Sequence, residues 1–257
     1  MFKQEIKIFF AALTFFTRIP LPLSSDMNSE ELLNRAAKYF PLTGWLIGGL
    51  CALVLWLSGF VLPHSIAIVL SMVAGVLITG AFHEDGFADT CDGFGGGWTK
   101  ERILDIMKDS RIGSYGAIGL VLILLAKYLL LAELPFAQLP LILIAAHSLS
   151  RLASTHCIIT HEYVGNHATS KAKPLCSEIT KTEMAIAMVF GIAPLFLLGN
   201  YWLLLTLIPV FIAKWWLTRY FNKWIGGYTG DNLGAIQQVT EIVFYVAVLV
   251  IIGIGAR

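Results

Sequence analysis

Long apolar runs alternate along this chain with short polar segments. A transmembrane helix needs about 20 mostly apolar residues, so the pattern predicts about seven spans. Their expected ranges are residues 40–62, 66–82, 115–134, 140–159, 184–198, 201–217 and 242–254. The fifth and seventh runs are short for a span. A further apolar stretch over residues 4–17, closed by Pro20 and Pro22, predicts an N-terminal helix lying in the membrane interface.

The composition agrees with a membrane-embedded chain. Hydrophobic residues make up 57% of the sequence and charged residues 14%, whereas soluble domains are about 25% charged. No long linker or repeat divides residues 1–257, so we expect one all-α domain, a polytopic helical bundle in the lipid bilayer. The net charge of +1 offers no field to attract nucleic acid. The cysteines show no CxxC pair, so no disulfide framework is expected.

The basic residues predict an orientation. Most Lys and Arg residues lie in four polar segments, residues 1–39, 83–114, 160–183 and 214–241. Lys and Arg are enriched in cytoplasmic loops of membrane proteins. The asymmetry therefore favours a multi-pass protein with a cytoplasmic N-terminus and all four segments facing the cytoplasm. The membrane we expect is a bacterial cytoplasmic (inner) membrane.

Residues 83–111, between the second and third spans, carry an excess of acidic side chains. Asp85, Asp89 and Asp92 are spaced i, i+4, i+7, which places them on one face of a helix. A second helix is expected over residues 99–112, where Asp105 and Asp109 form another i, i+4 pair. Glycines between the two sets allow sharp turns and a close approach of substrate.

The aspartates predict a metal site. Like charges on one helix face repel, and a bound cation removes that penalty. Carboxylate ligands favour hard ions, so we expect Mg²⁺, with Mn²⁺ as the alternative. Two carboxylate sets can hold two ions, as in many phosphoryl-transfer sites. Lys108 and Arg111 are placed to meet phosphate oxygens.

Two other interpretations of the acidic stretch stay open. Loops carry charge, so it can be a solvated acidic loop. Intramembrane acids mark ion paths, so it can also belong to a cation transporter. A transporter needs acidic residues at the bilayer midplane, and the expected spans contain none there.

A second glycine-rich segment, residues 226–232, lies before the last expected span. Backbone N–H groups at Thr229 and Gly230 can cradle phosphate or ribose, and Asp231 can contact a metal ion or a hydroxyl group. A plain turn is the alternative.

Several motifs together resemble the cobalamin-5′-phosphate synthase family. They cover nearly the whole chain, and as a set they are specific. The matching motifs are Leu13-Thr14-Phe15-x-Thr17-Arg18-Ile19-Pro20, Phe40-Pro41-Leu42-x-Gly44, His83-x-Asp85-Gly86-x-Ala88-Asp89-Thr90-x-Asp92-Gly93, Ile106-Met107-x-Asp109-Ser110-Arg111-x-Gly113-x-x-Gly116 and Gly227-x-Thr229-Gly230-Asp231-x-Leu233-Gly234-Ala235, with Gln237 and Glu241 shortly after the last.

The resemblance implies a reaction on corrinoid and nucleoside substrates. α-Ribazole or its 5′-phosphate attacks adenosylcobinamide-GDP through its ribose 3′-hydroxyl, and GMP leaves. By this resemblance Asp85, Asp89, Asp92, Asp105 and Asp109 are expected to hold metal, and Asp109 and Asp92 to be catalytic, with Asp109 as the base. Lys127 and Arg151, inside expected spans, are expected to contact phosphate or corrinoid amides; an internal ion pair or snorkelling is the alternative.

The family in turn resembles the CDP-alcohol phosphotransferases, whose pattern is DxxDGxxAR followed by DxxxD. Asp89-x-x-Asp92-Gly93 and Asp105-x-x-x-Asp109 match its two ends, but the AR pair is missing. A CDP-alcohol phosphatidyltransferase of lipid synthesis is therefore the alternative enzyme. A homo-oligomer stays possible.

Overall fold

The computed structural model of the protein describes residues 2–20, 30–165 and 179–255, and within these ranges its regular elements are helices. The exception there is an isolated bridge between Tyr163 and Tyr228. The all-α prediction is confirmed. In chain order the elements are α1 (Phe2–Phe16), α2 (Glu30–Ala36), η2 (Ala37–Tyr39), α3 (Phe40–Gly59), α4 (His64–Thr79), α5 (Phe82–Gly96), α6 (Lys100–Met107), α7 (Ser114–Glu133), η3 (Phe136–Gln138), α8 (Leu139–Thr160), α9 (Lys181–Leu197), η4 (Tyr201–Thr206), α10 (Leu207–Ile225) and α11 (Gly230–Gly255).

Five helical stretches of the described chain are long and apolar enough to cross a membrane. They are Leu32–Gly59, Ser114–Glu133, Phe136–Thr160, Tyr201–Ile225 and Gly230–Gly253. The consecutive helices α4 and α5 pass the same test as a bent pair, which makes a sixth candidate. α9, with 17 residues, is not among them. The chain is thus a multi-pass helical protein, and the seven-span prediction is not confirmed.

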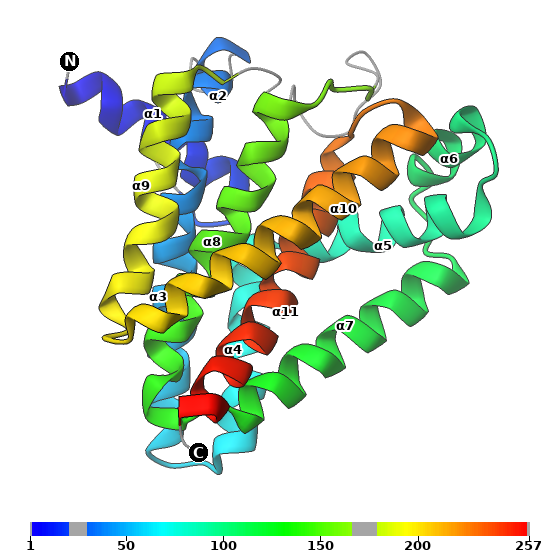
Figure 1. Cartoon of the computed structure of the whole chain (residues 1–257). Coiled ribbons are helices and arrows are strands. Elements are labelled where there is room, and N and C mark those ends of the chain that lie inside the picture. Colours follow the sequence, from blue (N-terminus) through cyan, green and yellow to red (C-terminus); the bar gives the residue numbers. More distant parts are fainter. Residues whose placement is uncertain (1, 21–29, 166–178, 256–257) are drawn as a thin grey trace.

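The bend between α4 and α5 turns the acidic helix across the bundle. α4 ends at Thr79, and Gly80 and Ala81 follow in the left-handed conformation with φ of 67° and 58°. That conformation ends a helix, and glycine adopts it without steric cost. The two helix axes are bent by 87° (Figure 1). The expected span over residues 66–82 is therefore wrong at its end: a 16-residue helix stops and α5 leaves at about a right angle.

The last two long helices also differ from their expected ranges. α10 continues to Ile225, beyond the expected end at residue 217, and stops at Gly226 with φ of 82°. α11 starts at Gly230 rather than at residue 242. Because the first turns of α11 contain polar residues, the hydrophobic pattern did not show that they belong to the helix. Because of the earlier start, Glu241 lies inside α11, whereas the sequence pattern had placed it in the polar segment of residues 214–241.

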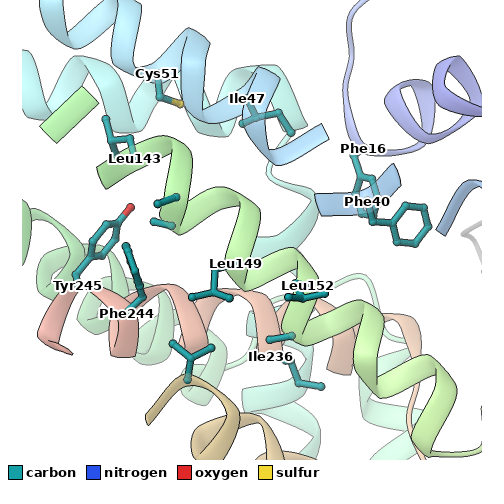
Figure 2. Close-up of a cluster of buried hydrophobic side chains, with 14 of the residues drawn as sticks. Phe16, Phe40, Ile47, Cys51, Leu143, Leu149, Leu152, Ile236, Phe244 and Tyr245 are labelled. Atoms are coloured by element: carbon teal, nitrogen blue, oxygen red, sulfur yellow. The ribbon is translucent and has the colours of Figure 1, made fainter. Parts of the chain in front are cut away.

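The core is built where α3, α8 and α11 cross. Figure 2 shows Ile47 of α3 and Leu149 of α8 among the buried apolar side chains of this region. A Cβ atom at Gly48 would lie 2.7 Å from the Cα of Ile144, so glycine lets α3 and α8 pack backbone to backbone. The outward side of α7, by contrast, exposes Val121 and Leu122, as expected of a helix facing lipid.

Candidate functional site

The three aspartates spaced i, i+4, i+7 lie on one helix, α5, as the sequence indicated. Their surroundings differ. Asp85 is exposed and Asp89 is half-buried, whereas Asp92 is 8% exposed. The helical spacing is confirmed, but the three carboxylates do not share one environment.

Asp92 caps the first turn of α7. Its Oδ2 accepts a hydrogen bond from the backbone N–H of Gly113 at 2.7 Å, and its Oδ1 accepts one from Gly116 at 2.8 Å. The first N–H groups of a helix have no partner within the helix, and negative charge is favourable there. Asp92 therefore joins α5 to α7, and its expected roles in metal binding and catalysis stay predictions.

Asp85 has a neighbour that lies far away in the sequence. A Cβ atom at Gly86 would lie 2.9 Å from the Cα of Asp231, so the backbones of α5 and α11 touch beside Asp85. The charge of Asp85 acts on the Asp231 carboxyl group. Neither aspartate forms an ion pair within residues 2–20, 30–165 and 179–255. Two neighbouring carboxylates without a cation are a suitable start for a metal site.

The start of α11 is tied to α5 by Asn232. The backbone N–H of Thr229 donates to Asn232 Oδ1 at 3.0 Å, and the Asn232 N–H donates back to Thr229 Oγ1 at 3.3 Å. This reciprocal pair satisfies N–H groups at the helix start as a capping box does. The Asn232 side-chain amide also donates to Thr90 Oγ1 at 3.2 Å. The contacts of Thr229 and Gly230 with substrate stay predictions.

The second aspartate pair is not on one helix. α6 ends at Met107, so Asp105 lies on the helix and Asp109 beyond its end. The expected helix over residues 99–112 is therefore wrong at its C-terminus. Asp109 forms an ion pair with Arg111 at 2.7 Å, which raises the pKa of that exposed guanidinium group. Asp105 and Lys108 are exposed to solvent.

Within the described ranges, no three His, Cys, Asp or Glu side chains are gathered closely enough to hold a metal ion alone. Magnesium usually takes one or two carboxylates together with substrate phosphates and water. The pair Asp85 and Asp231 fits that pattern. The five expected aspartate ligands are not brought into one cluster, and their assignment stays a prediction.

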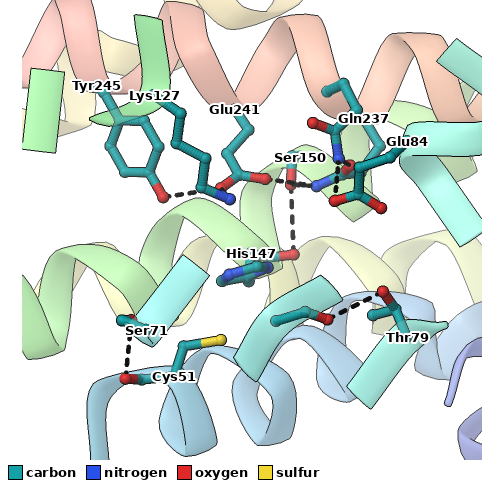
Figure 3. Close-up of polar contacts among 12 residues, drawn as sticks. Cys51, Ser71, Thr79, Glu84, Lys127, His147, Ser150, Gln237, Glu241 and Tyr245 are labelled. Atoms are coloured by element: carbon teal, nitrogen blue, oxygen red, sulfur yellow. Dashed lines mark hydrogen bonds and ion pairs between the residues drawn. The ribbon is translucent and has the colours of Figure 1, made fainter. Parts of the chain in front are cut away.

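A network of buried polar side chains lies in the interior of the protein (Figure 3). Lys127 of α7 forms an ion pair with Glu241 of α11 at 2.6 Å. Glu241 also accepts hydrogen bonds from Tyr245 at 2.8 Å and from Gln237 at 2.7 Å. The structure thus gives Lys127 an internal ion pair, and its contact with substrate stays a prediction.

Glu241 is an acidic residue well inside a span, where none was expected. Because it is paired with a lysine, it does not present a free carboxylate to a transported ion.

Arg151 is 2% exposed in the middle of α8. Its Nη1 donates to the backbone oxygen of His147 at 2.9 Å, whereas its Nε has no partner. Elsewhere in the network, the side-chain amide of Gln238 donates to Glu84 Oε1 at 3.1 Å, and the second carboxylate oxygen of Glu84 is unpaired. A cavity with about 20 Å³ of room for the centres of water molecules lies between them, enough for about one water.

Sequence reasoning gave no site role to Asn232, Gln238 or Glu241. Thr229-x-x-Asn232 has the spacing of a helix cap, which signals that α11 begins before the apolar run. With that start, Gln238 and Glu241 fall inside the helix, and polar residues there point to a buried network.

These features define a class. The protein is a multi-pass membrane protein of α-helices, with Asp85 and Asp231 near the close contact of α5 and α11. Residues 8–249 match the sequence model of the cobalamin-5-phosphate synthase family, so the chain belongs to that family.

Curated relatives agree over the full length. The chain is 48% identical over 252 residues to an adenosylcobinamide-GDP ribazoletransferase of Shewanella frigidimarina, with 96% of each chain covered. A protein of the same name from Shewanella amazonensis is 47% identical over 254 residues, with 97% of each covered. The resemblance seen in the sequence motifs is confirmed. No solved structure matches the chain, so the likeness to CDP-alcohol phosphotransferases stays an expectation.

Proposed function

We propose that this protein joins adenosylcobinamide-GDP to α-ribazole, or to its 5′-phosphate, and releases GMP. Full-length similarity to ribazoletransferases is the observation that carries the proposal. The ribose 3′-hydroxyl attacks the phosphorus on the corrinoid side of the diphosphate. A new P–O bond forms to the ribose, the bond to GMP breaks, and the hydroxyl proton passes to a base. The product is adenosylcobalamin or its 5′-phosphate.

Asp85 and Asp89 of α5, with Asp231 of α11, are the carboxylates that would hold Mg²⁺ in this proposal. The close approach of the Gly86 and Asp231 backbones, and the absence of an ion pair at Asp85 or Asp231 in the described chain, support it. When bound, the ion neutralises diphosphate charge and stabilises charge developing on the leaving group. Asp92, Asp105 and Asp109 remain proposed further ligands. Asp92 also fixes the start of α7 beside them.

Asp109 is the proposed acceptor of the hydroxyl proton, as expected in the sequence analysis. It lies just beyond α6, with Lys108 one residue before it and Arg111 paired to it. The two exposed cations can bind phosphate oxygens of the incoming diphosphate. In this arrangement, a substrate phosphate would pair with Arg111 in place of Asp109. The Asp109 carboxylate would then be free to accept the proton.

We place the reaction at the cytoplasmic face of a bacterial inner membrane. The basic residues of the segments that flank α5 and α11 support this orientation.

The test is GMP release by the purified, folded protein given adenosylcobinamide-GDP, α-ribazole and Mg²⁺. We expect turnover that requires all three and that a chelator abolishes. Glu133→Gln, at the exposed far end of α7, should leave the rate unchanged. The absence of GMP from a sample with an intact unfolding transition would contradict the proposal.

A further inference from the structure

A lysine lies buried in α10 without an acidic partner. Lys214 is 4% exposed, and it forms no ion pair within residues 2–20, 30–165 and 179–255. A buried ammonium group without a counter-ion costs considerable free energy. Charged residues in membrane helices therefore usually pair or mark a functional site. Lys127 of α7 has such a partner in Glu241, whereas Lys214 lacks one in the described chain.

Lys214 faces the end of α8. Its Nζ donates to Thr160 Oγ1 at 3.0 Å. About one turn earlier on each helix, the ring of Phe211 meets the ring of His156 edge to face, with the centroids 5.5 Å apart. Residues three or four apart share a helix face, so both contacts belong to one interface between α8 and α10. We call Lys214, His156 and Thr160 the lysine site.

The lysine site has donors without acceptors. An ammonium group carries three N–H donors, and Thr160 is the one acceptor of Lys214 in the described chain. The Nδ1 atom of His156 is buried and has no hydrogen-bond partner there, and it can donate in one of the two neutral tautomers. Glu162, two residues beyond Thr160, is exposed and forms no ion pair within the described ranges. An anion would therefore satisfy donors from two helices.

The lysine site reaches the protein surface near the end of a membrane span. Thr160 is the last residue of the candidate span Phe136–Thr160, and it is exposed. Trp215 and Trp216, directly after Lys214, are 58% and 59% exposed. Tryptophan is enriched where a membrane meets water, which indicates that this part of α10 lies at the depth of lipid headgroups. A ligand can therefore approach Lys214 past Thr160, without entering an internal cavity.

We propose that the lysine site binds a phosphate group, with Lys214 and His156 donating to its oxygens. A phosphate supplies the negative charge and the several acceptors that the site lacks, and lysine binds phosphate as a point charge. Two sources carry this group: the headgroup of an anionic phospholipid, and the 5′-phosphate of α-ribazole 5′-phosphate. The second source rests on the proposed function. It is within the same region, because the Tyr228 N–H donates to the Glu162 oxygen at 3.0 Å and joins the end of α8 to the start of α11.

The experiment is thermal unfolding of the purified full-length protein in a nonionic detergent, with inorganic phosphate added against chloride at equal ionic strength. Phosphate should raise the unfolding temperature of the wild type, because a ligand of the folded state stabilises it. Lys214→Met should lose this rise. Lys223→Met removes the same charge from an exposed position on α10 and should keep it. No rise in the wild type, or an equal rise in Lys214→Met, would overturn the proposal.

A second variant covers a failure of Lys214→Met to fold. His156→Phe keeps a ring against Phe211 but removes the ring nitrogen, so it should need about tenfold more phosphate for the same rise. A wild-type response of His156→Phe would then overturn the proposal.

Two further comparisons identify the source of the phosphate. A short-chain phosphatidylglycerol is compared with an uncharged glycolipid of the same chain length, and α-ribazole 5′-phosphate is compared with α-ribazole. A rise that depends on Lys214 and occurs with phosphatidylglycerol assigns the site to a lipid, and one that occurs with α-ribazole 5′-phosphate assigns it to the substrate. A response to neither compound would overturn the proposal. These measurements report binding, so a failure to release GMP would reject the proposed function without deciding the lysine site.

Discussion

Asp92 of α5 holds the start of α7 through Gly116, whose backbone N–H donates to Asp92 Oδ1 at 2.8 Å. A Cβ atom at Gly116 would collide with the same carboxylate and would lie 2.9 Å from the Ala88 oxygen. The aspartate and the glycine therefore depend on each other. This contact gives a structural reason for two motifs that lie more than 20 residues apart, and it ties the acidic helix to the lipid-facing helix.

The first prediction concerns Asp92→Asn. The asparagine oxygen can still accept one backbone N–H of α7, but its amide group faces the other donor. We expect a loss of about 1–3 kcal/mol of stability, because one buried N–H group stays unpaired. We also expect GMP release to fall by orders of magnitude while the protein still folds. Thermal unfolding in detergent and the GMP assay measure the two effects separately.

Gly116→Ala tests the same contact from the other helix. It should displace the Asp92 carboxylate and reduce stability without removing any charge. Gly49→Ala is the matched control, because a Cβ atom there has nothing within 4 Å. If Gly116→Ala were as stable and as active as Gly49→Ala, the cap would not matter.

The sequence predicted the helices better than their ends. The apolar run from residue 115 became α7 almost as expected, because its boundaries coincide with a glycine turn and with Pro135. The α4–α5 bend was missed, because Phe82 extends the apolar run past a turn set by Gly80 and Ala81. Hydropathy reports burial in lipid or protein but not the direction of the chain.

The site was predicted only in part, because the sequence pattern does not show contacts between distant segments. Helical spacing correctly placed Asp85, Asp89 and Asp92 on one helix. It could not show that Asp92 turns towards α7, or that Asp231 lies beside Asp85, because both contacts join distant segments. The buried network around Glu241 was hidden by the wrong start of α11.

A second prediction concerns the ion pair between Lys127 and Glu241, 2.6 Å apart in the interior. Lys127→Met alone should destabilise the protein by about 3–5 kcal/mol, because a buried carboxylate loses its cation. Adding Glu241→Gln should restore part of that loss, since no unpaired charge remains. Denaturant unfolding of the single and double variants gives the coupling energy. Additive losses in the double variant would show that the pair is not coupled.

A third prediction concerns Mg²⁺ and the pair Asp85 and Asp231. Asp85→Asn should raise the Mg²⁺ concentration needed for half-maximal GMP release by about tenfold or more, because a charged ligand is lost. Asp231→Asn should do the same, whereas Glu101→Gln, an exposed acid on α6, should not. A Mg²⁺ titration of each variant measures this. If both variants kept the wild-type midpoint, the metal would not lie at the α5–α11 contact.

The fourth prediction is a pH dependence at the N-terminal helix. Glu5 of α1 pairs with Lys38 at 2.6 Å and accepts a hydrogen bond from Tyr39 at 2.8 Å. The hydrogen bond from Lys38 is the main cause that holds the pKa of Glu5 below its ordinary value of 4.5, against a smaller opposing effect of burial. A carboxyl group with a lowered folded pKa stabilises the folded state above its unfolded pKa. That contribution is lost as the pH falls through the folded value.

Glu5→Gln should therefore be less stable than the wild type at pH 7, and the difference should vanish towards pH 3. Because the Glu5 side chain is 36% exposed, solvent screens the pair and the difference should be below about 1 kcal/mol. Thermal unfolding of both proteins at a series of pH values measures it. Glu133→Gln, an acid without an ion pair in the described chain, should show no such change. A deficit in Glu5→Gln that is equally large at pH 3 and pH 7 would mean that side-chain shape, and not the charge of Glu5, holds α1 against α2 and η2.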